Sequence, residues 1–126
     1  MAKQMPTDIK TEPLDKLYFN APFKEKKNYK IAIINTGAKP LAWCVKSTNV
    51  SRISFDPSAG VLDANETFMF SAITEVFEPT PENLKQDQIT IEWILAPDGE
   101  GRKFNREWMQ RDVIVRRKHI TVFYNP

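Results

Sequence analysis

Residues 28–48 read NYKIAIINTGAKPLAWCVKST, and this stretch predicts the fold class. Apolar and aromatic side chains recur at every second position in each half, so they share one face of an extended chain. They are Tyr29, Ile31 and Ile33 in the first half and Leu41, Trp43 and Val45 in the second. Between the halves, NTGAKP contains the glycine and proline of a turn. The stretch therefore predicts two strands joined by a short turn.

Five further runs rich in β-branched and aromatic residues lie on either side. They are KLYFNA (16–21), RISF (52–55), TFMFSAI (67–73), QITIEWIL (88–95) and the C-terminal stretch 113–124. Turn residues separate them in DPSAG, EPTPEN and APDGEG. About seven short strands at regular spacing predict an all-β protein, an antiparallel β-sandwich. We expect its core to include Ile33, Trp43, Phe70, Ile91 and Trp93.

Helical signals are confined to two short segments. TPENL (80–84) has Thr80 as a capping residue and Pro81 at the first helical position, and NREWMQ (105–110) is the second segment. The 9 prolines spread along the chain oppose a helical bundle.

Length and charge narrow the class of protein. The 126 residues are expected to form one domain, residues 1–126, which is long enough to bury a core without disulfides or metals. The 18 basic and 16 acidic residues leave a net charge of +2, which argues against a nucleic-acid partner. Cys44 is the only cysteine, as expected in a reducing compartment. The sequence has no apolar signal peptide and no membrane-spanning run, so we expect a cytoplasmic protein without membrane insertion.

Residues for catalysis or cofactor binding are scarce. His119 is the only histidine and Cys44 the only cysteine, which excludes a multi-histidine metal site and a zinc tetrad. A nucleophile would need His119 as its base, but this histidine lies within a predicted strand. The four glycines all lie in turns and form no phosphate-binding loop. We therefore expect no enzyme activity, no catalytic residues, no metal and no cofactor.

The C-terminal stretch DVIVRRKHITVFYNP (112–126) places three cations beside the histidine. In a strand, Arg116 and Lys118 share one face and Arg117 takes the other, so the three cations form no single patch. Apolar residues occupy both faces between residues 113 and 124. We therefore predict a bulge or bend near Arg117 and Lys118, which lets the valines at 113 and 115 reach the core and leaves the cations in solvent.

Several motifs resemble the nematode major sperm protein family almost from end to end, over residues 7–126. They are YFNAPF, VKSTN, DPSAGVLD, QITIEW, APDGEGRKFNREW and VRRKHITVFYNP. The combination of REW at 106–108, VRRK at 115–118 and a terminal YNP is specific. The family's QGDG before MVRRK is replaced here by QRDVIVRRK, with Arg111 and Val113 at the glycine positions. This difference is compatible with a divergent sperm-specific paralogue.

The resemblance implies an immunoglobulin-like, seven-stranded sandwich that forms a symmetric dimer and then filaments. In the family, these filaments drive amoeboid sperm crawling in the pseudopod without nucleotide, accessory proteins take part, and the protein also signals to oocytes. Cis peptide bonds are expected at Glu12-Pro13 and Asp56-Pro57, where the family bends its strands. We expect an assembly surface at the C-terminal cations, where exposed ion pairs could set salt-sensitive contacts between copies. Its residues are Arg111, Arg116, Arg117 and Lys118.

A second hypothesis comes from the VAMP-associated proteins, which share this fold and bind acidic peptides with paired phenylalanines. Lys46 and Thr48 in VKST match the lysine and threonine of their peptide-binding groove. The groove's second lysine and its methionine correspond to Gln88 and Thr90, so an acidic peptide would lose a cation partner. An adaptor role is thus the alternative to filament assembly, with Lys46 and Thr48 as its candidate peptide-binding residues. A role as a regulator of a relative's filaments is also open.

Overall fold

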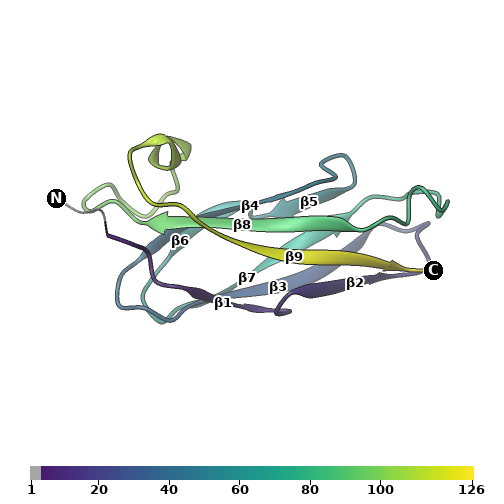
Figure 1. Ribbon diagram of the computed structural model, residues 1–126, viewed down its shortest axis with the longest axis horizontal. Helices are drawn as coiled ribbons and strands as arrows, with labels where there is room; N and C mark the ends of the chain where they lie inside the picture. Colours follow the sequence, from purple (N-terminus) through teal and green to yellow (C-terminus); the bar gives the residue numbers. More distant parts are fainter. Residues whose placement is uncertain (1–3) are drawn as a thin grey trace.

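The computed structural model describes residues 4–126 and folds them into two packed β-sheets (Figure 1). The strands are β1 (Ile9–Glu12), β2 (Lys16–Asn20), β3 (Lys27–Asn35), β4 (Leu41–Ser47), β5 (Ile53–Asp56), β6 (Ala59–Leu62), β7 (Thr67–Thr74), β8 (Asp87–Leu95) and β9 (Arg116–Asn125). One 3-10 helix, η1 (Arg106–Gln110), follows β8. All seven predicted runs form strands, and the predicted all-β sandwich is confirmed.

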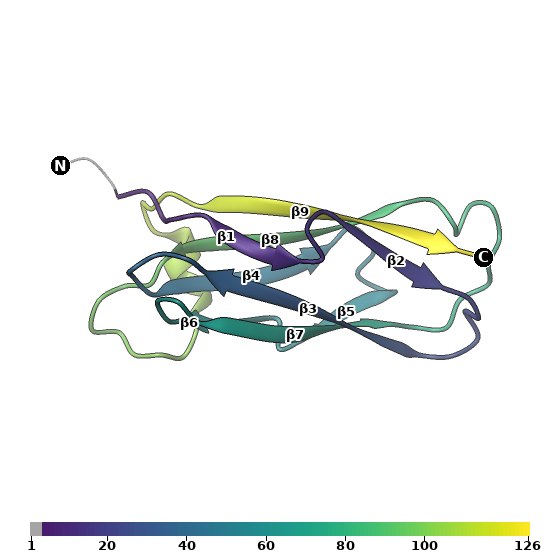
Figure 2. The same ribbon diagram turned by 90° about the horizontal axis from the view of Figure 1, so that it is seen from below.

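The four-stranded sheet has the order β1-β3-β7-β5, and the five-stranded sheet has the order β2-β9-β8-β4-β6. Neighbouring strands are antiparallel except β2 and β9, which are parallel. The chain crosses between the sheets at the bend that joins β1 to β2 (Figure 2). Both predicted cis bonds, Glu12-Pro13 and Asp56-Pro57, are present, together with a third at Ala21-Pro22.

Large side chains from both sheets meet between the layers. The five predicted core residues, Ile33, Trp43, Phe70, Ile91 and Trp93, are all buried. Trp43 of β4 stacks on Phe70 of β7, with 5.3 Å between the ring centroids. Burial of such aromatic side chains is a large part of the free energy of folding of a sandwich.

Two of the nine strands were not predicted from the sequence. β1 has the polar sequence IKTE, in which only alternate residues are buried. β6 begins within DPSAG, which was predicted to be a turn, and it pairs with β4 through Gly60 opposite Trp43. A Cβ atom at residue 60 would lie 3.2 Å from the Trp43 indole nitrogen, so a glycine allows the ring to pack against this strand.

Residues 96–115 fold over one end of the outer face of the five-stranded sheet and build a second, smaller core. Ala42, Ile94 and Trp108 are buried there, and the valines at 113 and 115 pack against them. Asn105 caps η1 by accepting a hydrogen bond from the Glu107 amide, as expected for NREWMQ. The other predicted helical segment, TPENL, forms a hydrogen-bonded turn and no helix.

The predicted bulge near Arg117 and Lys118 is wrong. β9 starts at Arg116, and its register with β8 is unbroken from Arg116 opposite Trp93 to Val122 opposite Asp87. The change of direction precedes the strand, because the apolar residues at 113 and 115 belong to the second core. Apolar residues on both faces therefore reflect two separate cores and not a bulge.

Candidate peptide-binding and assembly surfaces

The outer face of the five-stranded sheet carries the residues expected to bind peptides. Lys46 of β4 lies opposite Thr90 of β8, and the Thr48 amide donates to the Gln88 carbonyl oxygen at 3.0 Å. Thr90 also lies opposite His119 of β9, and the Thr90 hydroxyl is 2.9 Å from His119 Nδ1. The four aligned groove positions therefore lie together on one face.

Glu92 lies at the centre of this face and binds the cations on both sides of it. Arg117 Nε donates to Glu92 Oε2 at 2.6 Å, and Lys46 Nζ lies 3.3 Å from Oε1. The Cys44 sulfur is 4.0 Å from the same Oε1 atom. These residues meet because Glu92 lies opposite Cys44 in β4 and opposite Arg117 in β9. One carboxylate thus neutralises two cations from the neighbouring strands.

The electrostatics of this cluster follow from its composition. Partial burial alone would raise the pKa of Glu92, but hydrogen bonds from Arg117 and Lys46 outweigh it and lower this pKa below its ordinary value. Burial, followed by the nearby charge of Glu92, raises the pKa of the Cys44 thiol. The Cys44 thiol therefore stays protonated and weakly nucleophilic near neutral pH.

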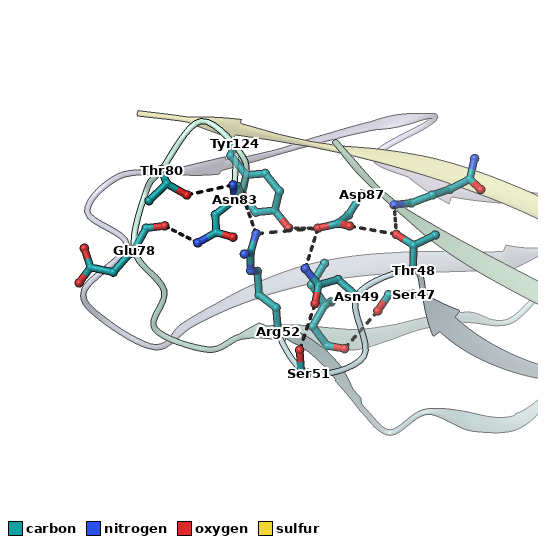
Figure 3. Close-up of polar contacts among 12 residues, drawn as sticks. Ser47, Thr48, Asn49, Ser51, Arg52, Glu78, Thr80, Asn83, Asp87 and Tyr124 are labelled. Atoms are coloured by element: carbon teal, nitrogen blue, oxygen red, sulfur yellow. Dashed lines mark hydrogen bonds and ion pairs between the residues drawn. The ribbon is translucent and has the colours of Figure 1, made fainter. Parts of the chain in front are cut away.

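A second polar cluster surrounds Asp87 at the end of the sandwich near the C-terminus (Figure 3). The Thr48 hydroxyl donates to Asp87 Oδ1 at 3.1 Å, and Asn49 Nδ2 donates to Oδ2 at 3.3 Å. The Tyr124 hydroxyl also donates to Oδ2, and Arg52 NH1 lies 3.9 Å from the same atom. The loop after β4, the start of β8 and the end of β9 are joined through this one carboxylate.

Arg52 and Tyr124 are held tightly within the Asp87 cluster. The Arg52 guanidinium lies 3.7 Å from the centroid of the Phe77 ring, and its NH1 donates to the Asn83 carbonyl oxygen at 2.7 Å. The side chains of Arg52 and Asp87 are only 10% and 13% exposed. Burial, together with the hydrogen bond to Asp87, raises the pKa of Tyr124 above its ordinary value. The phenol therefore remains neutral through the physiological range.

Three of the four cations expected on an assembly surface have partners within the same chain. Arg111 binds Glu100 through two hydrogen bonds of 2.5 and 2.8 Å, and Arg117 binds Glu92. Arg116 NH1 donates to the Pro6 carbonyl oxygen at 3.0 Å.

Arg116 also approaches the ring of Trp93, whose indole nitrogen donates to the Thr7 carbonyl oxygen. Arg116 and Trp93 together fasten the segment that precedes β1 to the five-stranded sheet.

The expectation that all three cations of β9 project into solvent is wrong for Arg116 and Lys118, which are half-buried on the face of β9 that also carries Ile120. Arg117 alone is exposed on the outer face. Within residues 4–126, Lys118 makes none of the hydrogen bonds or ion pairs found for the other three cations.

The sequence of this chain matches a known family over most of its length. A family model described as the MSP (Major sperm protein) domain matches residues 8–113. The chain is 44% identical over 126 residues to Major sperm protein isoform alpha of Ascaris suum, and the alignment covers 99% of each chain. Major sperm protein 2 of Onchocerca volvulus is 43% identical over 126 residues, again with 99% of each chain covered. The chain belongs to the major sperm protein family.

Solved structures of MSP-domain proteins share the architecture of this family member. SSP-19, an MSP-domain protein like family member of Caenorhabditis elegans, superposes with a TM-score of 0.71 at 14% identity, covering 93% of this chain and 99% of that chain. WR4, an MSP family member of C. elegans, gives a TM-score of 0.66 at 21% identity, with 93% and 95% covered. The expected immunoglobulin-like sandwich is thereby confirmed.

Membership in the major sperm protein family makes the chain a structural, non-enzymatic protein. Within residues 4–126, no helix has the length and apolar character needed to cross a membrane. Sequence reasoning did not single out Asp87, Glu92 or Arg52, the residues that organise both polar clusters. The available signal was Glu92 itself, a single carboxylate among the apolar residues of QITIEWIL.

Proposed function

We propose that this chain is a cytoskeletal protein of sperm, which dimerises and assembles into filaments that drive amoeboid crawling without nucleotide. The proposal rests on 44% identity to Major sperm protein isoform alpha over 99% of both chains. It places the chain in the cytoplasm, in the filament cytoskeleton of the pseudopod. Its partners are further copies of itself and filament accessory proteins, with no role for nucleic acid or membrane insertion.

A symmetric dimer needs a surface that can pair with itself, and the free edge of β2 is the candidate. β2 ends the five-stranded sheet, so among residues 4–126 no strand pairs with one side of its backbone. Leu14, just before β2, is 66% exposed, and Tyr18 within β2 is 47% exposed. Tyr18 stacks on Phe123 at 5.3 Å, which fixes its ring on the outer face. Antiparallel pairing of β2 with its copy would join two five-stranded sheets.

The free edge of the four-stranded sheet at β1 is less suited to this contact. β1 exposes Lys10 and Glu12, and charged residues at an edge oppose strand pairing. At the other edge, β5 has four residues and is followed at once by Pro57, which lacks a donor. These features favour β2 over β1 and β5 as the edge that forms the dimer.

Filament growth needs a further contact between dimers, and two cations of β9 support one: Arg117 on the outer face and Lys118, which is half-buried on the opposite face. Lys118 lacks an internal partner of the kind found for the other cations, and Arg117 is 54% exposed despite its bond to Glu92. We propose that both contribute salt-sensitive contacts to an acidic surface of the next dimer. Arg111 and Arg116 act mainly within the chain, because they hold residues 100–111 together and fasten the segment before β1.

Electron microscopy of the purified chain tests filament assembly directly. Under a crowding additive we expect filaments both with and without added ATP or GTP. Replacement of Lys118 by Glu should shorten them or raise the protein concentration needed for their formation. Replacement of Lys24, an exposed lysine on the loop before β3, by Glu is the control for the change in net charge. Absence of filaments in all wild-type conditions would favour a regulator of a relative's filaments.

The adaptor hypothesis is weaker, because both candidate peptide-binding residues are already engaged. Lys46 is paired with Glu92, and the Thr48 hydroxyl donates to Asp87. A peptide would have to compete with both carboxylates. Titration with an acidic peptide that contains paired phenylalanines separates this function from filament assembly.

A further inference from the structure

Two exposed cations on the outer face converge on a carboxylate that is itself mostly covered. The side chains of Lys46 and Arg117 are 63% and 54% exposed, whereas that of Glu92 is 14% exposed. Such a pair of accessible cations is the usual means by which a protein holds an external carboxylate. Here the carboxylate of Glu92, a residue of the sheet itself, supplies the negative charge that the two cations bind.

We propose that Glu92 acts as an internal ligand, whose carboxylate occupies Lys46 and Arg117 and thereby prevents this face from capturing acidic peptides. Both Glu92 oxygens are used, one at 3.3 Å from Lys46 Nζ and the other at 2.6 Å from Arg117 Nε. An external carboxylate would have to displace the carboxylate of Glu92, which is held in place because Glu92 lies within strand β8. The incoming group would also lose its hydration, and the repulsion of Glu92 would add to that cost.

The surroundings of Glu92 define which ligand the face would take without it. A cavity of about 560 Å³ lies between the sheet and η1. Lys46 and Arg106 line it together with the apolar side chains of Phe104 and Met109. Arg106 makes no ion pair like those of Arg111 or Arg117 within residues 4–126. Cations beside an apolar floor fit a peptide that carries both acidic and aromatic side chains. Glu92 thus determines the binding specificity of this face, because it prevents such peptides from binding to a surface that would otherwise accept them.

Cys44 offers an independent readout of the same contact. Its sulfur lies 4.0 Å from Glu92, and it is the only cysteine in the chain. Burial and then the charge of Glu92 raise the pKa of this thiol, and the charges of Lys46, Arg106 and Arg117 lower it. When the Glu92 charge is removed, burial still raises the pKa of the thiol, but the only charges left to act on it are the three cations, which lower it. The thiol should then ionise at lower pH and react faster with iodoacetamide.

The test compares Glu92→Gln with Glu100→Gln. Both variants remove one negative charge and one arginine-paired carboxylate, but Glu100 pairs with Arg111, and neither of these two residues lines the cavity beside Glu92. The probe is a fluorescein-labelled peptide that alternates glutamate and phenylalanine, followed by fluorescence polarisation. We expect Glu92→Gln to bind it at least about tenfold more tightly than wild type, and Glu100→Gln to match wild type. Addition of Lys46→Ala to Glu92→Gln should reverse the gain, and a probe with glutamine for glutamate should show none.

Two further measurements keep the test decisive. In Glu92→Gln the alkylation of Cys44 should accelerate and its pH profile should move to lower pH, whereas in Glu100→Gln both stay unchanged. If Glu92→Gln proves unstable, Glu92→Asp takes its place, because it keeps the charge but moves it back by one methylene group. The affinity of Glu92→Asp for the labelled peptide should lie between that of wild type and that expected for Glu92→Gln. Equal affinity of wild type and both Glu92 variants, or an equal gain in Glu100→Gln, would overturn the proposal. An unchanged Cys44 profile in Glu92→Gln would overturn it as well.

Discussion

The Asp87 and Glu92 clusters use the same chemistry in two different environments. Both place a carboxylate of β8 between cations and polar groups from neighbouring elements. The Arg52 and Asp87 side chains are only 10% and 13% exposed, whereas the cations bound to Glu92 are more than half exposed. A buried charge left without its partner is costly, but an exposed one is hydrated. Asp87 therefore stabilises the fold, and Glu92 mainly determines what the outer face can bind.

Removal of Arg52 should have the largest effect on stability. In Arg52→Ala, Asp87 keeps its charge but loses its cation, and Phe77 loses the guanidinium that lies 3.7 Å from its ring centroid. Breaking one partner of a buried pair typically costs about 3 kcal/mol or more. Urea unfolding should show this loss. A change below about 1 kcal/mol would place Arg52 with the exposed ion pairs instead.

Tyr124→Phe should have a smaller effect that depends on pH. Loss of the hydroxyl leaves Asp87 without one donor, which costs about 1–2 kcal/mol near neutral pH. The pKa of Tyr124 is raised in the folded state, so its contribution is present below its ordinary pKa of 10.0 and is lost as pH rises above that value. Wild-type stability should therefore fall toward Tyr124→Phe in alkaline solution. A constant difference between the two up to strongly alkaline pH would contradict this reading.

Glu92→Gln should change stability little while it changes binding. Exposed pairs contribute about 0–1 kcal/mol, and the two cations of Glu92 are mostly exposed. The pKa of Glu92 is lowered in the folded state, so its contribution is present above its ordinary pKa of 4.5 and disappears as pH falls below it. Thermal unfolding of wild type and variant should therefore converge in acid. A difference that grows in acid would show that Glu92 has another role.

Arg111→Ala should have the smallest effect on stability. Glu100 lies between β8 and η1, and Arg111 directly follows η1. Their side chains are 39% and 45% exposed. Both side chains are therefore open to water and their pairing is screened by salt. We expect the unfolding midpoint of Arg111→Ala to equal that of wild type. A clear loss of stability would show that this pair also supports the second core around Trp108.

The sequence predicted the parts of the fold that depend on local alternation. Trp43, Ile33 and Ile91 show a period of two, and all three are buried in the core. β6 was missed because its residues gain their strand structure from pairing with β4 and not from their own propensity. The predicted position of the bend in the C-terminal stretch was wrong, because Val113 and Val115 pack in a second core that no local sequence pattern indicates.

The candidate sites depended even more on tertiary pairing. Lys46 and Arg117 lie far apart in the sequence, and they meet only through Glu92 on the strand between them. A cross-strand register of this kind follows from topology, which alternation alone does not specify. The cations therefore appeared free in the sequence, although two of them share one carboxylate in the structure.

Sedimentation equilibrium across protein concentration tests the self-association of this chain most directly. We predict a dimer at micromolar concentration for wild type, without nucleotide. Tyr18→Glu should shift it to monomer, because the change places a charge at the edge of β2. Val50→Glu is the matched control, since Val50 is 81% exposed on the loop after β4, away from that edge. A wild-type chain that stays monomeric at the highest concentration, or a dimer that Tyr18→Glu leaves intact, would contradict the proposed assembly through β2.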